Sequence, residues 1–219
     1  MGVVKLDAYV LIMRGKDTLN LLNGLSTNKV DSSCSTVFTT NAAKVIDLAE
    51  VLVMDGFVAL VGHNPFKESI LHHLSQKILD QDITIGDASA SNNVYLSTTE
   101  ISPPAGVTTS HTFRGWLMVA PTNVEIKTTM SQNEFDDYRV ENMIPMQGFE
   151  ITPKNHPLAC GLGHLVHESK GCYLGQEVLA RMRSRGKQGK ELVRLPNPVE
   201  NATTVGKKNS LTIQRVRNS

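Results

Sequence analysis

The sequence predicts an α+β fold made mostly of antiparallel sheets with flanking helices. Two apolar runs flank Asp55-Gly56 in residues 51–62, VLVMDGFVALVG, and this pattern indicates a β-hairpin with a tight turn. Other apolar segments that suit strands are interspersed with capped amphipathic helices. They lack the regular strand–helix alternation that a parallel sheet requires. With 219 residues, the chain is long enough for one large domain or two small ones.

The N-terminal half is expected to contain one strand and one helix before the hairpin and a second helix after it. Residues 7–13, DAYVLIM, suit a strand, and residues 15–30 suit a helix capped by Asp17. After the hairpin, Asn64 suits a helix cap and Pro65 the first helical position. That second helix repeats apolar side chains every four residues, as an amphipathic helix does: Phe66, Ile70, Leu74 and Ile78.

The C-terminal half is expected to add three strands, a helix and a short terminal element. Residues 82–89, 93–101 and 114–121 suit strands, and the proline-containing segment ISPPAGVTTS predicts a loop. A Ser-x-x-Glu capping box, Ser131 and Glu134, opens the predicted helix. After that helix the pattern is irregular until a short helix and one or two strands near the end of the chain.

The composition is ordinary for a globular protein, with 40% hydrophobic and 20% charged residues. No run of about 18 apolar residues occurs, so we expect no membrane-spanning helix and no membrane partner. The start, MGVVKLDAYVLIM, has neither the pattern of a secretory signal nor that of a transit peptide. Three cysteines, Cys34, Cys160 and Cys172, favour free thiols in a reducing, cytoplasmic setting.

Charge is distributed unevenly along the chain, although the net charge is only +1. Residues 170–219 contain eleven Lys/Arg and three Glu, a formal charge of +8, whereas residues 1–169 carry −7. A basic end on an acidic body predicts an anionic ligand or partner near the C-terminal part. A solvated basic surface without a partner explains the same charges equally well.

The segment KGCYLGQEVLAR, residues 170–181, places Cys172 in a setting that suits a reactive thiol. A nearby cation and a helix N-terminus both lower a thiol pKa, and Lys170 and a helix beginning near Gly175 would provide them. Gly171 and Gly175 allow a ligand to approach the backbone. The alternative is a buried, inert cysteine, because Cys is among the most buried residue types. The spacing taken alone favours this alternative.

A metal site is the third interpretation of the same region. Cys160, His164, His167 and Cys172 lie within thirteen residues, and all four are zinc-type ligands. Their spacing, C-x3-H-x2-H-x4-C, matches none of the common structural zinc patterns. We therefore expect no bound metal.

Two further groups of charged residues are candidates for ligand binding. Arg139 and Glu141 lie at the end of the capped helix, where a carboxylate suits two amide-type donors of a heteroaromatic ring. A surface ion pair explains these two residues as well. Glu177 is expected either to bind ligand or to pair with an arginine one helical turn away. On an extended segment, the alternating arginines would project to one side and suit carboxylates or phosphates: Arg181, Arg183 and Arg185.

These residues together resemble the YgfZ-type folate-binding proteins, relatives of the glycine-cleavage T-protein, which is an aminomethyltransferase. KGCYLGQEVLAR is similar to the signature motif of that family. RGKDTLNLLNGLSTNKV resembles its N-terminal helix, TTNAAKVIDL the strand that follows, and YRVENMIPMQGFEITPKNHPL the segment before the cysteine motif. The matches occur in order from about Arg14 to Leu195, which is most of the chain.

The resemblance implies two interleaved folate-binding subdomains around a central pocket, with tetrahydrofolate as the cofactor. It places the first subdomain in residues 1–47 plus 128–187 and the second in residues 48–127. Residues 188–219 are too few for the family's C-terminal β-barrel, so a hairpin-like remnant is expected there. Because that barrel helps to enclose the folate, the site is expected to be more open.

The resemblance also implies roles for individual residues. Cys172 is the candidate reactive thiol, with Lys170 and Tyr173 beside it in the signature. Glu141 matches the position that holds the pterin ring in T-protein relatives, and Asn28 lies in a matching turn. The expected cofactor-binding residues are Glu141, Arg139, Asn28, Gly171, Gly175, Gln176, Glu177 and Arg181.

The chain departs from the family pattern at two turns. Ala43-Lys44 stands where the family usually has Gly-Arg, and Met143 where it usually has Gly. Alanine and methionine tolerate a positive φ poorly, so both turns are expected to be altered.

The function that the resemblance implies is tetrahydrofolate binding in support of iron–sulfur cluster assembly or repair, and thereby of iron–sulfur enzymes such as those that modify tRNA. The expected partners are folate and iron–sulfur assembly or client proteins, and the chain is expected to be a monomer. No aromatic–basic interleaving suggests direct nucleic-acid binding. The alternative is a folate-dependent aminomethyl or methyl transferase, which needs an acidic residue after the hairpin. Ser69 stands at that position, with Glu68 beside it, and this weakens the alternative.

Overall fold

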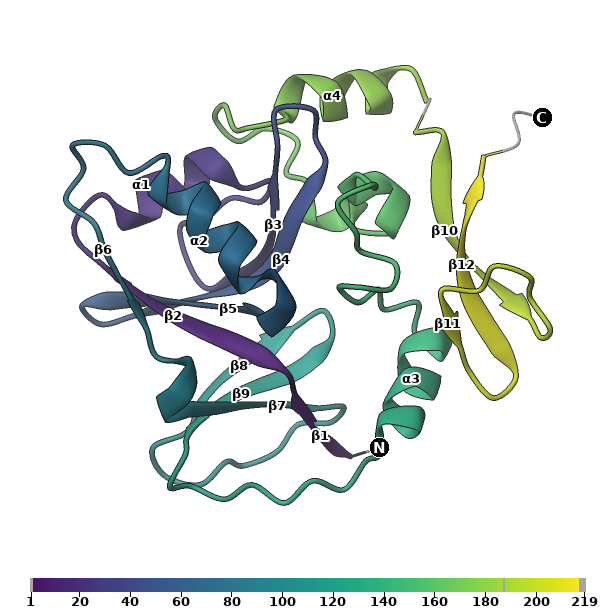
Figure 1. Cartoon of the computed structure of the whole chain (residues 1–219), viewed down its shortest axis with the longest axis horizontal. Coiled ribbons are helices and arrows are strands. Elements are labelled where there is room, and N and C mark those ends of the chain that lie inside the picture. Colours follow the sequence, from purple (N-terminus) through teal and green to yellow (C-terminus); the bar gives the residue numbers. More distant parts are fainter. Residues whose placement is uncertain (1, 187, 217–219) are drawn as a thin grey trace.

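Two antiparallel sheets form the body of the molecule in the computed structural model, which describes residues 2–186 and 188–216 (Figure 1). The five-stranded sheet has the order β3-β4-β5-β2-β6, with strands Cys34–Thr39, Val45–Met54, Phe57–His63, Ala8–Arg14 and Thr84–Asp87. The four-stranded sheet has the order β1-β7-β9-β8, with strands Val3–Leu6, Asn92–Ser97, Gly115–Pro121 and Thr108–Thr112. The predicted α+β class with antiparallel sheets is therefore confirmed.

Two helices and the two sheets stack in three layers. Helices α1 (Thr18–Leu25) and α2 (Lys67–Ser75) cover one face of the five-stranded sheet (Figure 1). Successive residues of β2 point to opposite faces, so Tyr9 and Leu11 pack in the helix layer while Val10 packs toward the four-stranded sheet. The five-stranded sheet is consequently buried on both faces and carries the centre of the core.

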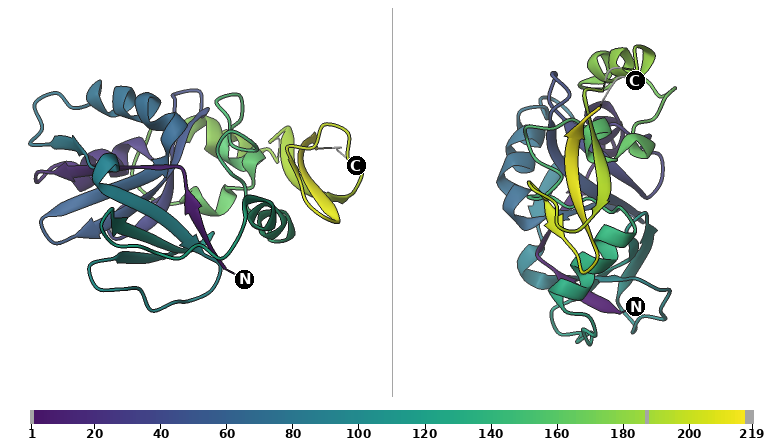
Figure 2. Two further views of the ribbon diagram at one scale, coloured as in Figure 1. Left: turned by 60° about the horizontal axis from the view of Figure 1, so that its bottom comes forward. Right: turned by 90° about the vertical axis from the view of Figure 1, so that its right-hand side faces the viewer.

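The remaining elements lie beyond one end of these layers. They include α3 and α4, and a separate three-stranded sheet of order β10-β12-β11 stands on the far side of α3 (Figure 2). This C-terminal sheet contacts α3 through Leu192 and Leu211, which pack on Val140. The bounds are Gln132–Glu141 for α3, Gln176–Ser184 for α4, Lys190–Pro196 for β10, Thr204–Val205 for β11 and Asn209–Arg215 for β12. Short 3-10 turns are Asn64–Phe66, Ser89–Ser91, Pro157–Cys160 and Gly163–Leu165.

Two local predictions hold in the structure. Strands β4 and β5 form the expected hairpin around Asp55-Gly56, and Gly56 has the positive φ of 77° that this turn requires. Ser131 and Glu134 form the expected capping box at the start of α3. Both signals are local, because every group that makes the turn or cap lies within four residues.

Other element predictions were wrong at their ends. Helix α1 ends at Leu25 rather than near residue 30, and the Asp17 side chain accepts a hydrogen bond from Asp82 N at 2.9 Å instead of capping the helix. Asn64 and Pro65 lie in a 3-10 turn that precedes α2. Strands β1 and β8 were not predicted, and β8 lies partly in the segment expected to be a loop. Both are edge strands; β1 pairs with the distant β7, whereas β8 forms a hairpin with β9.

The two turns that depart from the family pattern keep a glycine-like backbone. Ala43 has a φ of 57° and Met143 a φ of 52°, both in the left-handed region. An L side chain costs about 1 kcal/mol there relative to glycine. The expectation of altered turns is therefore wrong for the backbone, and the cost of the substitution is carried as strain.

The division into two interleaved subdomains expected from the sequence stays a prediction. The boundary after residue 47 lies inside β4, whereas residues 190–215 form a sheet of their own. No helix in the described ranges is long and apolar enough to cross a membrane.

Candidate functional site

A narrow pocket, which we call the central pocket, lies where β5 ends, β2 begins and α3 passes nearby. Its cavity volume is about 20 Å³, so the pocket is a narrow slot. Leucine and phenylalanine side chains form much of its wall: Leu6, Leu96, Leu117 and Phe135. Its polar lining residues are Asp7, His63, Arg114, Arg139 and Gln147. Apolar walls with a few polar groups are typical of a site for a small organic ligand.

Beneath the pocket, a carboxylate is buried under a glycine. Asp47 of β4 is fully buried, and its Oδ2 accepts a hydrogen bond from the Tyr9 hydroxyl at 2.7 Å. Gly62 lines the pocket directly above this pair, and a Cβ there would lie 2.5 Å from Asp47 Oδ2. Glycine at position 62 therefore allows the Tyr9–Asp47 pair to lie just below the pocket.

Burial raises the pKa of Asp47 to about 7. Hydrogen bonds from Tyr9, Gln147 and the Leu48 amide oppose this rise but do not cancel it. Burial and the neighbouring Asp47 together hold the pKa of Tyr9 well above its usual range. Asp47 therefore changes its charge near neutral pH, whereas Tyr9 stays protonated and remains the donor.

Gln147 connects the buried carboxylate to the pocket. Its Nε2 donates to Asp47 Oδ1 at 3.2 Å and to the Leu48 carbonyl oxygen at 2.6 Å. Its Oε1 is buried without a hydrogen-bond partner. An unpaired buried acceptor costs about 1–3 kcal/mol, so this oxygen marks a position that a ligand or water would satisfy.

Arg114 supplies a donor on the same pocket. Its Nη2 lies 2.9 Å from Glu50 Oε1, and Ser35 donates to Glu50 Oε2 at 2.5 Å. The Nε of Arg114 is buried and has no partner among the described residues. The pocket therefore presents one unpaired donor and one unpaired acceptor.

Arg139 lines the pocket but has no free donor. Its side chain is 1% exposed, and all five N–H groups are used inside the protein. Nε and Nη2 bond Asp136 Oδ1, Nη2 also bonds Thr204 Oγ1, and Nη1 bonds Glu150 Oε2 and the Ile144 carbonyl. These bonds tie α3 to the loop after it and to β11, so the geometry shows a structural clamp rather than a ligand-binding arginine.

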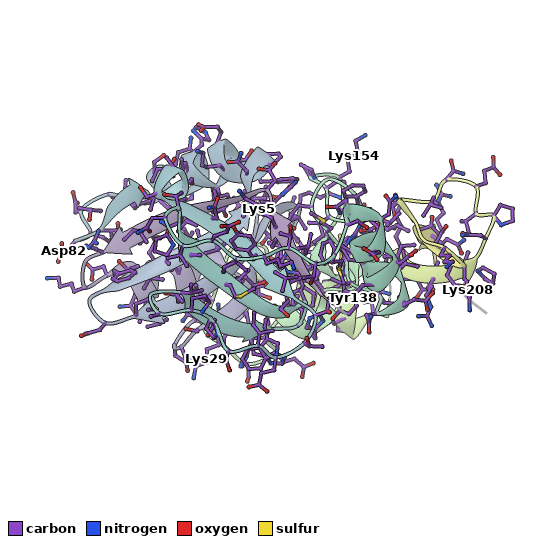
Figure 3. The ribbon with its side chains drawn as sticks, turned by 90° about the horizontal axis from the view of Figure 1, so that it is seen from below. Lys5, Lys29, Asp82, Tyr138, Lys154 and Lys208 are labelled. Carbon is purple, nitrogen blue, oxygen red and sulfur yellow. The ribbon has the colours of Figure 1, made fainter. Side chains whose placement is uncertain are left out.

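Glu141 lies outside the central pocket. It is exposed near the end of α3, where its carboxylate accepts from Arg194 at 3.3 Å and from Asn209 at 2.8 Å. Both partners belong to the C-terminal sheet. Figure 3 labels one residue on each side of this junction, Tyr138 of α3 and Lys208 of the turn before β12.

Lys170 is also fully satisfied inside the protein. Its Nζ donates to the carbonyl oxygens of Asn23, Ser26 and Asn28 at 2.6, 2.8 and 2.5 Å. These carbonyls lie in and just after the last turn of α1, where helical partners are missing. Burial lowers the pKa of Lys170 to about 8, and the ammonium lies 5.1 Å from the centre of the Tyr173 ring. Lys170 therefore caps α1, with all three donors engaged.

The rest of the signature presents Cys172 at the surface. Gly171 and Cys172 are exposed, whereas Tyr173 is buried with Leu179 of α4. Gly175 has a φ of 84° and lies so close to the β3–β4 turn that a Cβ would be 2.8 Å from Thr39 Oγ1. The expectation of a buried Cys172 is wrong, and glycine at 175 serves backbone packing.

The charged residues of α4 are mostly paired with each other or with backbone. Arg181 Nη2 lies 2.5 Å from Glu177 Oε1, the expected i,i+4 pair. Arg183 contacts Glu168 and the Gly163 carbonyl, and with Gln176 it lines a shallow second pocket. The expectation of an extended arginine segment is wrong, because Arg181 and Arg183 are helical and Arg185 follows the last helical residue.

Two other predicted residues are placed in structural contacts. Asn28 Nδ2 donates to the Ser35 carbonyl and its Oδ1 accepts from Lys29 N, so its side chain holds the turn before β3. Cys160 is buried, and burial raises the pKa of its thiol to about 12. No group of three or more potential metal ligands occurs among residues 2–186 and 188–216.

The structure thus separates the central pocket from the signature segment 170–181. Among the predicted cofactor-binding residues, Arg139 lines the pocket, whereas those of the signature segment do not. Sequence reasoning missed Arg114, Gln147 and Asp47. A signal existed for Asp47 alone, since an acidic residue inside the apolar strand VIDLAEVLVM is unusual.

Comparison with solved structures shows a T-protein-like fold. The chain superposes on the crystal structure of the glycine cleavage system aminomethyltransferase T from Bartonella henselae with a TM-score of 0.76. The two share 11% sequence identity, and the alignment covers 97% of this chain and 78% of the other. No family model and no curated protein matches the sequence. At this identity the similarity shows the fold alone.

Proposed function

We propose that the central pocket binds the pteridine ring of tetrahydrofolate or a related folate. The observation that carries this proposal is the pair of buried, unpaired polar atoms, Arg114 Nε and Gln147 Oε1, on two residues that line one pocket with largely apolar walls. A pteridine is flat, apolar on its faces and rich in donors and acceptors at its edge, which suits a narrow pocket with apolar walls and a few polar residues. When bound, tetrahydrofolate supplies one-carbon chemistry at its ring nitrogens.

The finer proposal is an accessory role in iron–sulfur cluster assembly or repair. The support is the sequence resemblance of residues 14–195 to the YgfZ-type proteins. In this proposal the chain acts as a cytoplasmic monomer, and its body corresponds to two interleaved folate-binding subdomains. The exposed Cys172 then faces client or assembly proteins rather than the folate.

A folate-dependent aminomethyltransferase is the second candidate, and the T-protein-like fold is equally compatible with it. Two observations bear on the choice. Ser69 and Glu68 are exposed on α2 and do not line the central pocket, so neither supplies a carboxylate there. Asp7 does line the pocket, and so does His63. The Nδ1 atom of His63 lies 2.7 Å from the Asp7 carbonyl oxygen. Asp7 is thus the carboxylate that a transferase of this geometry would use.

Calorimetry with 5-formyltetrahydrofolate, a chemically stable reduced folate, tests the shared part of both candidates. We expect binding at micromolar ligand to the wild-type protein. A matched variant, Ala8→Phe, enlarges a side chain that lines the pocket and is expected to abolish binding. Absence of binding to the wild-type protein at high micromolar ligand would refute the proposal.

Two activity assays then separate the candidates. The accessory role predicts that cells lacking the protein lose several iron–sulfur enzyme activities together, and that Cys172→Ser fails to restore them. The transferase role predicts folate-dependent release of ammonia from an aminomethyl donor, lost in Asp7→Asn and retained in Cys172→Ser. Ammonia release with intact iron–sulfur enzymes would reject the accessory role.

A further inference from the structure

Strand β6 forms an edge of the five-stranded sheet, and its backbone is paired on one side only. It is the last strand in the sheet order and lies at the outside of the molecule (Figure 1). Ala88 N donates to the Val10 carbonyl oxygen of β2 at 2.9 Å, so alternate residues of β6 direct their N–H and C=O groups toward β2. Ile85 and Asp87 therefore direct theirs outward, where the described residues provide no backbone partner. Such an edge can accept an added strand.

Helix α2 forms a groove along this free edge, which we call the α2–β6 groove. Its lining includes Glu68 and Leu71 of α2, Ile78 just after the helix, and Ile85 and Asp87 of β6. The two strand residues whose backbone points outward thus also line the groove. A strand edge beside a groove suits an extended peptide, because main-chain hydrogen bonds provide affinity and alternate side chains enter the groove. The α2–β6 groove shares no lining residue with the central pocket.

The two ends of the groove differ in chemistry. Lys67 Nζ lies 2.9 Å from Asp87 Oδ2, which places the start of α2 beside the end of β6. Glu68 and Asp87 therefore make this end acidic. Farther along, the floor is apolar, because Leu71 and Ile85 pack against the same core cluster and both line the groove. The groove thus has an acidic end and an apolar end.

The charges around the groove favour a basic partner. Residues 67–87 contain four carboxylates and two lysines, a formal charge of −2. Lys67 is paired with Asp87, whereas Glu68 has no ion-pair partner in the part of the chain that the structure describes. A cation entering the acidic end would find in Glu68 an unpaired carboxylate. Complementary charge of this kind steers a partner and fixes its register.

We propose that the α2–β6 groove binds an extended segment of a partner protein as an added antiparallel strand, with Lys or Arg at the acidic end and an aliphatic residue two positions later at the apolar end. The backbone groups of Ile85 and Asp87 each exchange N–H and C=O hydrogen bonds with this segment. The partner residue opposite Asp87 precedes the one opposite Ile85, because the strands run in opposite directions. Strand β6 has only four residues, so its bare edge is short and the groove supplies the specificity.

The test uses three fluorescein-labelled heptapeptides in fluorescence anisotropy. The probe is Gly-Thr-Lys-Thr-Ile-Thr-Gly, in which the lysine lies two positions before the isoleucine. The second peptide has glutamate in place of lysine. The third carries N-methyl groups on the lysine and isoleucine nitrogens, which are the donors that face β6. We expect the probe to bind about tenfold more tightly than the glutamate peptide. We expect it to bind about thirtyfold more tightly than the N-methylated peptide, since two hydrogen bonds are lost.

Two variants with matched controls locate the binding site. Ile85→Pro removes an outward N–H, a change that sheet edges tolerate, and is expected to weaken probe binding about tenfold. Ile85→Val keeps the N–H and should stay within about threefold of the wild-type affinity. Glu68→Gln is expected to reduce the preference for lysine over glutamate to within about threefold. Glu125→Gln, which changes an exposed carboxylate after β9, should leave the preference unchanged. Urea unfolding verifies that each variant is folded at the assay temperature.

Absence of probe binding to the wild-type protein, equal affinity for the N-methylated peptide, or unchanged affinity in Ile85→Pro would each overturn the inference. Sedimentation adds a further check, because a wild-type dimer that dissociates in Ile85→Pro would assign the edge to a second copy of the chain instead. These outcomes are independent of calorimetry with 5-formyltetrahydrofolate. Failure of the inference therefore leaves the proposed function standing.

Discussion

The central pocket and the signature segment 170–181 differ in whether their polar groups have hydrogen-bond partners within the protein. In the segment, Lys170 has three donors and three carbonyl acceptors, and Glu177 pairs with Arg181. In the pocket, Arg114 Nε and Gln147 Oε1 are buried and unpaired. A buried polar group that is satisfied locally stabilises the fold, whereas an unsatisfied one is available to a ligand. The most recognisable motif in the sequence therefore differs from the best-equipped ligand site.

The largest effect on stability is expected at Arg139, because this residue lines the pocket and yet has all five of its N–H donors hydrogen-bonded within the protein. Arg139→Met is expected to destabilise the protein by about 3–5 kcal/mol, since it leaves the buried Glu150 without its cation. Urea unfolding measures this loss. Arg194→Met removes a solvent-exposed pair with Glu141 and should cost less than about 1 kcal/mol. Similar losses of unfolding free energy in Arg139→Met and Arg194→Met would contradict the structural role of Arg139.

Lys170 tests the structural role of the signature segment. Lys170→Met leaves three carbonyl oxygens at the end of α1 without a donor and is expected to cost about 2–3 kcal/mol. Chemical denaturation measures the change. Lys154 projects from the surface (Figure 3), so Lys154→Met is the matched control and should be nearly neutral. A stable Lys170→Met protein with a slower-reacting Cys172 would instead assign the lysine to thiol activation.

Asp47 gives an effect on stability whose size depends on pH. Burial raises its pKa from 3.8 to about 7, so the folded state holds the proton more tightly than the unfolded state. The wild-type protein therefore loses stability as pH rises from about 4 to about 7, and Asp47→Asn does not. We expect Asp47→Asn to be more stable by about 4 kcal/mol at pH 8, with the difference vanishing near pH 4. Thermal unfolding at pH 8, 6 and 4 measures this, and a pH-independent difference would disprove the buried titration.

Cys172 is expected to show the smallest effect on stability. Cys172→Ser changes an exposed side chain and should alter the free energy of unfolding by less than about 0.5 kcal/mol. In the folded wild-type protein, alkylation should modify Cys172 first. Burial raises the pKa of Cys34 to about 11 and that of Cys160 to about 12, so both should react slowly. Mass spectrometry of the alkylated peptides gives the order, and faster labelling of Cys160 would be inconsistent with the structure.

Local patterns in the chain account for the features that depend on neighbouring residues. The Asp55-Gly56 hairpin, the Ser131–Glu134 capping box and the start of α4 after Gly175 were all predicted, because each is made by groups within a few residues. The α+β class follows from the same patterns. Edge strand β1 was missed because its partner β7 lies about 90 residues away, and β8 was missed because its polar residues, Thr108–Thr112, resemble a loop although it forms a hairpin with β9.

The candidate site depends on contacts that no local pattern reports. Gln147 and Asp47 are 100 residues apart, and Lys170 reaches carbonyls more than 140 residues away. A single sequence shows which side chains are polar but not which of them are buried without a partner. Tertiary packing alone decided that Lys170 and Arg139 have all their donors hydrogen-bonded, while Gln147 and Arg114 each keep one unpaired polar atom. The reason is that the fold determines which hydrogen-bond partners lie near a buried group.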